Sequence, residues 1–133
     1  MWRIILIILN LFNVLSCVGG FTYIVLAGAP EMPVAEMTRP GTFENLTIPG
    51  WILLVVVGGT HLIAAIALLR RTPHAALWSA ISGFTMVIWI YVEVVLMTGT
   101  NWMHHLWGVL GLAEIGCTLA LLGVFKAAPK PAG

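Results

Sequence analysis

The fold is decided by residues 51–69, which read WILLVVVGGTHLIAAIALL and are followed directly by Arg70 and Arg71. This uncharged run is long enough to cross the hydrocarbon core of a bilayer, which takes about 20 mainly apolar residues in a helix. The whole chain has the same character: of its 133 residues, 60% are hydrophobic and 8% are charged, and its mean hydropathy is +1.03. A water-soluble domain of this size has too little interior to bury so much apolar surface. We therefore expect an integral membrane protein.

Three further apolar stretches also predict transmembrane helices. The four predicted spans are residues 4–26, 51–69, 75–97 and 104–125. Residues 28–50 are polar and rich in proline, so we expect them to form a loop rather than a span. The other connections are short, which makes consecutive helices antiparallel neighbours. Residues 1–133 are thus predicted to be one all-α domain, an integral membrane four-helix bundle with antiparallel up-down topology.

The basic residues predict the orientation of this bundle. All but one fall on the same side of the predicted spans: Arg3, Arg70, Arg71, Lys126 and Lys130, with Arg39 alone on the other. Because cytoplasmic segments carry the excess of Lys and Arg, both termini are predicted to be cytoplasmic and the loop 28–50 to face outward.

An alternative for the N-terminus is a cleaved signal peptide. Residues 14–17, which read VLSC, resemble a lipoprotein cleavage site. The apolar run, however, continues to Leu26, whereas the apolar core of a signal peptide ends after about 7–15 residues. A retained transmembrane helix is therefore the favoured interpretation.

Ionisable side chains are costly inside a bilayer, so each one is a candidate for a functional site. At a rise of about 1.5 Å per residue, His61 and Glu114 each lie about 15 Å from the outer edge of their span, and Asn13 about 20 Å. These three side chains, from different helices, are therefore expected to converge near the midplane. The predicted intramembrane polar site comprises His61, Glu114, Asn13, Thr60 and Trp107.

A second polar cluster is predicted nearer the outer surface. Glu93 lies about 6 Å from the outer edge of its span, and His104 begins the next span after a short link. The predicted outer cluster comprises Glu93, His104, His105 and Trp89. Counting in steps of three or four places the polar and small residues of the first, third and fourth spans on one face each, which should point into the bundle.

Each of these residues also has a structural interpretation. Asn13 is favoured as an interhelical hydrogen-bonding residue, and the glycines as points of close helix packing. His61 and Glu114 form either a structural pair or a functional site, and the sequence leaves both open. Glu93 and the two histidines can simply extend toward water at the interface. Cys17 and Cys117 are expected to be separate apolar residues rather than a disulfide.

Four functional interpretations follow from these residues. A metal site would need ligands at one depth, and the His and Glu residues show no HxxxH spacing and divide between two depths, so no metal site is predicted. Haem would need a second histidine opposite His61, which the midplane lacks. A His–Glu pair suits acid–base chemistry on a quinone or another lipid-soluble substrate. The fourth interpretation is non-catalytic: an accessory or small-molecule-binding subunit.

Glycine, tryptophan and acidic residues in these spans also resemble a known family. They are the GGTHL stretch of residues 58–62 leading to Arg70-Arg71, Gly83 with Trp89 and Glu93, and Gly108 with Gly111 and Glu114. This arrangement is similar to small four-helix bacterial membrane proteins of the DoxX-like kind, some of which are associated with oxidoreductase systems and quinone-linked thiosulfate oxidation. The resemblance implies a bacterial plasma (inner) membrane location and a four-helix bundle, and it carries over no catalytic residue.

The sequence therefore predicts a small-molecule-binding or accessory membrane protein, with a membrane-embedded enzyme as the alternative. Its expected partners are the lipid bilayer, a lipid-soluble small molecule, and a second copy or a larger membrane complex. A net charge of +1 and the lack of any Lys/Arg-rich stretch speak against nucleic acid. The sequence leaves the cofactor and the substrate open.

Overall fold

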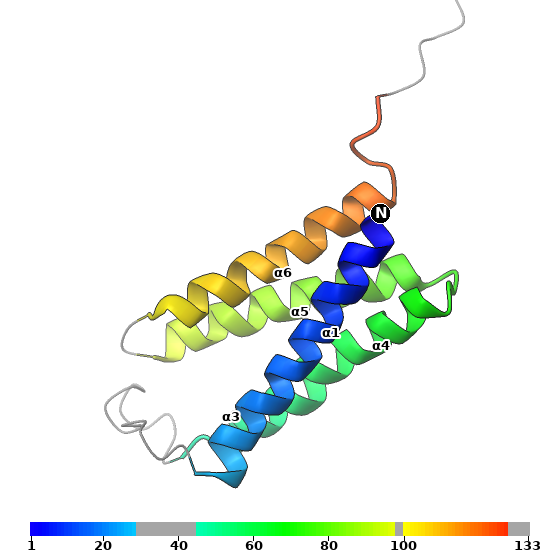
Figure 1. The fold of residues 1–133 in the computed structure, drawn as a ribbon. Helices are drawn as coiled ribbons and strands as arrows, with labels where there is room; N and C mark the ends of the chain where they lie inside the picture. Colours follow the sequence, from blue (N-terminus) through cyan, green and yellow to red (C-terminus); the bar gives the residue numbers. More distant parts are fainter. Residues whose placement is uncertain (29–44, 98–99, 128–133) are drawn as a thin grey trace, which may run out of the picture.

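The computed structural model describes residues 1–28, 45–97 and 100–127, and its secondary-structure elements there are all helices. Helix α1 (Trp2–Phe21) continues into the π-helical segment η1 (Thr22–Leu26), and α3 (Thr47–Ile52) continues through the π-helical η2 (Leu53–Gly58) into α4 (Gly59–Leu69). Helices α5 (Ala75–Leu96) and α6 (Trp102–Leu121) complete the fold (Figure 1). The all-α prediction is confirmed.

Two helix boundaries differ from the predicted spans for local reasons. Helix α3 begins at Thr47, although the sequence predicts a loop as far as Gly50. Pro49 lies in the first turn of this helix, where its missing N–H would have had no intrahelical partner in any case. Helix α6 ends at Leu121 rather than near Phe125. Gly123 follows with a φ of +79°, the left-handed conformation that commonly terminates helices.

Three helical stretches of the described chain are long and apolar enough to cross a membrane. They are Trp2–Leu26, Thr47–Leu69 and Ala75–Leu96, with mean hydropathies of 2.3, 2.5 and 1.8. Helix α6 is not among them, because His104, His105 and Glu114 lower its hydropathy. At about 1.5 Å per residue its 20 residues would still extend for about 30 Å, the thickness of the hydrocarbon core.

The chain ends and the helix connections separate into two ends of the molecule. Figure 1 shows the start of α1, the turn between α4 and α5, and the end of α6 at one end, which we call the basic end because it carries Arg3, Arg70, Arg71 and Lys126. The Arg3 guanidinium donates a hydrogen bond of 2.7 Å to the Leu68 carbonyl oxygen, which joins the start of α1 to the end of α4. The ends of η1 and α5 and the starts of α3 and α6 lie at the opposite end.

The helices bury their polar faces and expose apolar ones. The buried residues of α6 are His104, Gly111, Glu114 and Thr118, and those of α1 are Leu6, Asn10, Asn13, Cys17 and Phe21. Large apolar side chains such as Ile8, Leu15 and Val109 are more than half exposed. The predicted inward polar faces are thus confirmed, and the outward faces suit lipid.

Candidate functional site

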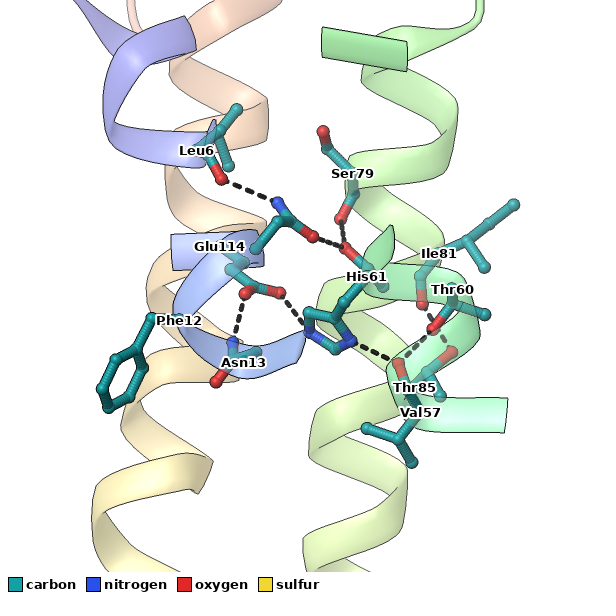
Figure 2. Close-up of polar contacts among 12 residues, drawn as sticks. Leu6, Phe12, Asn13, Val57, Thr60, His61, Ser79, Ile81, Thr85 and Glu114 are labelled. Carbon is teal, nitrogen blue, oxygen red and sulfur yellow. Dashed lines mark hydrogen bonds and ion pairs between the residues drawn. The ribbon is translucent and has the colours of Figure 1, made fainter. Parts of the chain in front are cut away.

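His61, Glu114 and Asn13 form a hydrogen-bonded network in the middle of the molecule. His61 Nε2 lies 3.0 Å from Glu114 Oε2, and Asn13 Nδ2 donates to Glu114 Oε1 over 2.5 Å. All three side chains are fully buried. Figure 2 shows them projecting toward one another from α4, α6 and α1, so the convergence expected from helix depth is present.

The backbone fixes where His61 carries a proton. Its Nδ1 lies 2.6 Å from the Val57 carbonyl oxygen, which can only accept, so Nδ1 is the donor. Nε2 and Glu114 Oε2 therefore share one proton between them. Val57 lies in the π-helical segment η2, two residues before α4 begins at Gly59. The same carbonyl also accepts from the Thr60 hydroxyl. Such π segments are frequent beside functional sites.

A second buried link joins α1 to α5, one helical turn from this network. The Ser82 hydroxyl lies 2.9 Å from Asn10 Oδ1 and 3.0 Å from the Ser79 carbonyl oxygen, while Asn10 Nδ2 donates to the Leu6 carbonyl (Figure 2). Asn10 and Asn13 thus both act as interhelical hydrogen-bonding residues, the role that the sequence predicts for Asn13.

An apolar cavity of about 610 Å³ occupies the half of the molecule away from the basic end. Its walls come from α1, η1, η2, α5 and α6, and its volume is within the range of small-molecule sites. Cys17, Met86 and Trp107 line it on the side of the buried network, where Cys17 and Met86 pack together with Val57. Glu93 is the acidic residue and His104 the basic residue among those that line it.

Glu93 and His104 face each other across α5 and α6. His104 Nε2 lies 3.5 Å from Glu93 Oε2, and the Glu93 side chain remains 30% exposed. Asn101 caps α6: its side chain accepts from the Met103 N–H, and its own N–H donates to His104 Nδ1 over 3.0 Å. Because Nδ1 accepts, the neutral ring carries its proton on Nε2, directed at Glu93.

The predicted site residues are divided between the buried network and the apolar cavity. In the predicted intramembrane set, Trp107 lines the cavity, whereas Thr60 bonds to the Val57 carbonyl and the other three form the enclosed network. In the predicted outer cluster, Trp89 also lines the cavity and His105 is exposed. Asn101 was not predicted, although an asparagine directly before a helix is a recognisable N-cap signal.

The network and the cavity differ in what they can do chemically. His61 and Glu114 do not line the cavity, and their polar atoms are engaged with each other, with Asn13 and with Val57. Among residues 1–28, 45–97 and 100–127, no three His, Cys, Asp or Glu side chains converge to hold a metal ion. Both cysteines are free thiols. The cavity, rather than the network, therefore offers room for a ligand.

Comparisons with models of protein families, with curated proteins and with solved structures find no match to this chain.

Proposed function

We propose that this protein is a four-span membrane protein that binds a lipid-soluble small molecule in the 610 Å³ cavity. The observation that carries the proposal is a mainly apolar cavity in which one acidic and one basic lining residue, Glu93 and His104, lie side by side. Small-molecule sites are typically apolar with a few polar groups that orient the ligand. A bilayer would supply a lipid-soluble molecule to such a cavity directly.

Glu93 and His104 indicate which kind of molecule would fit. His104 Nε2 points its proton toward Glu93, and the partly exposed Glu93 carboxyl keeps hydrogen-bonding capacity on the cavity side. We infer a ligand with an apolar body and a hydrogen-bonding head, such as a phenol, a hydroquinone or a long-chain alcohol. Trp89 and Trp107 would pack against its body.

We also propose that both termini are cytoplasmic and that the cavity lies in the outer half of the membrane. The support is the gathering of Arg3, Arg70, Arg71 and Lys126 at one end of the described chain. The bacterial inner membrane and the likeness to DoxX-like proteins stay predictions from the sequence.

The alternative function is acid–base chemistry on such a molecule. The observation that favours it is that Glu93 and His104, two side chains able to donate and accept a proton, line the cavity together. Turnover of a bound quinone or hydroquinone that ends on Glu93→Gln substitution would distinguish catalysis from binding.

Filling the cavity tests the proposed function. Ile90→Trp places a bulky ring in the cavity wall, whereas Ile88→Trp adds the same ring to the exposed face of α5 and serves as the matched control. We expect lipid-soluble molecules that co-purify in mild detergent, identified by mass spectrometry, to be lost from Ile90→Trp and retained by Ile88→Trp. Glu93→Gln should weaken retention roughly fivefold, about 1 kcal/mol, because it alters the hydrogen bond to the head. An unchanged set of molecules in folded Ile90→Trp would contradict the proposal.

A further inference from the structure

A second cavity lies at the basic end and differs in chemistry from the first. It has a volume of about 390 Å³ and lies between the start of α1, the turn after α4 and the end of α6. Three of its lining side chains are cationic: Arg3, Arg71 and Lys126. These residues are far apart in sequence, so the fold itself gathers the three charges around one space.

This positive charge has no acidic neighbour among the described residues that line the cavity. The two described carboxylates are both engaged elsewhere: Glu114 bonds to His61 and Asn13, and Glu93 lies across from His104 at the opposite end. Three uncompensated cations around one cavity repel each other, and a bound anion would remove that repulsion.

The lining groups are also of the types that bind phosphate. Arg3 uses one nitrogen, Nη1, for the Leu68 carbonyl, which holds the guanidinium in place, and within residues 1–28, 45–97 and 100–127 its other N–H groups make no hydrogen bond. Arg71 adopts a φ of +53°, in the left-handed region that non-glycine residues seldom occupy. Guanidinium groups bind phosphate oxygens in a bidentate manner, and a lysine adds a point charge.

The rest of the lining is apolar and amphipathic. Ile4 and Leu121 line the cavity beside the three cations, and Trp2, 40% exposed, lines it as well. A cavity with a cationic part and an apolar part at the end of a transmembrane bundle suits a molecule with a phosphate head and an acyl tail.

We propose that this basic cavity binds a phosphate group, carried by an anionic phospholipid or free in solution. The site is separate from the outer cavity, and the proposal does not depend on a ligand there. Arg3, Arg71 and Lys126 supply the donors to the phosphate oxygens, and Ile4 and Leu121 offer the surface for an acyl chain.

The test compares lipids and variants by native mass spectrometry of the full-length chain in detergent. The probes are phosphatidylglycerol, phosphatidylcholine and inorganic phosphate. The central variant is Arg71→Gln, and its matched control is Arg70→Gln, which removes the same charge from the adjacent residue that does not line the cavity. We expect phosphatidylglycerol to be retained over phosphatidylcholine, and Arg71→Gln to weaken that retention about fivefold, the contribution of one basic residue near a membrane surface. Arg70→Gln should change it little.

A second variant guards against a folding failure. Arg71→Gly removes the charge while relieving the left-handed strain, so it should fold at least as well as the parent and still lose the lipid preference. Displacement of phosphatidylglycerol by millimolar inorganic phosphate would identify a soluble phosphate as the source, and retention despite it would identify the lipid. Equal binding of the two lipids together with no effect of phosphate, or equal losses in Arg70→Gln and Arg71→Gln, would overturn the proposal.

Discussion

Position 114 requires a side chain whose two terminal atoms make different hydrogen bonds. One oxygen accepts from Asn13, and the other shares a proton with His61 Nε2. A glutamine matches both ends, because its oxygen can accept from Asn13 and its NH2 can donate to an unprotonated Nε2. Leucine matches neither end.

We therefore predict that Glu114→Gln loses less than about 1 kcal/mol of unfolding free energy, while Glu114→Leu loses about 1–3 kcal/mol by stranding its buried partners. Denaturant unfolding in detergent, followed by circular dichroism, measures both. Equal losses in the two variants would show that the hydrogen bonds are not what Glu114 contributes.

His61 allows the same network to be tested as a pair. His61→Leu and Glu114→Leu should each destabilise, and the double variant should recover part of the summed loss because neither partner is left buried alone. Recovery should be incomplete, since Asn13 still lacks the acceptor that Glu114 supplied. Strictly additive losses would mean that His61 and Glu114 are not coupled.

At this scale the sequence predicted the network from helix depth alone. Because helix rise is constant, counting residues placed His61, Glu114 and Asn13 at a similar depth. The same counting placed Glu93 near the outer edge, close to His104. The use of the Val57 carbonyl could not be predicted, because it depends on where the helix changes to π geometry. The contact of Asn101 with His104 depends on the cap conformation.

Helices α5 and α6 pack closely at Gly83 and Gly111. A Cβ added to Gly83 would lie 2.9 Å from Ile115 Cγ1 and 3.2 Å from the Gly111 carbonyl oxygen, so there is no room for it. A Cβ added to Gly116 of α6 would have no neighbour within 4 Å. Small residues at such contacts allow backbones to pack closely in membrane bundles.

Gly83→Ala should therefore separate α5 from α6 and lower the unfolding free energy by about 1–3 kcal/mol. Gly116→Ala should be neutral or stabilise by up to about 1 kcal/mol, because alanine is the better helix former. Thermal unfolding in detergent compares the pair, and a loss in Gly116→Ala as large as that in Gly83→Ala would argue against close packing as the cause.

Element positions could be predicted more fully than element details. Apolar length and short links located all four helices, since these properties are local. The π-helical segments η1 and η2 were not predicted, because the sequence shows no pattern that distinguishes them from α-helix. The start of α3 at Thr47 could have been inferred, because the first turn of a helix tolerates a proline such as Pro49.

The described helices bury polar side chains beside apolar ones and expose many large apolar side chains. Periodicity predicted these faces because each helix carries its own pattern, whereas the two cavities could not be predicted because they arise from spaces left between several helices. Both functional proposals depend on this arrangement: the apolar cavity lies at one end, and the basic cavity lies at the other. They also depend on α6 crossing the membrane beside the three more apolar helices.

Cysteine labelling in intact cells tests this central claim most directly. In a background with Cys17 and Cys117 replaced by alanine, single cysteines at exposed Asn45, His74 and Ala127 mark the end before α3, the turn before α5 and the chain after α6. We predict that a membrane-impermeant maleimide labels Asn45→Cys from outside, and labels His74→Cys and Ala127→Cys only after permeabilisation. Labelling of Ala127→Cys from the same side as Asn45→Cys would show that α6 does not cross the membrane, and would contradict the four-span account.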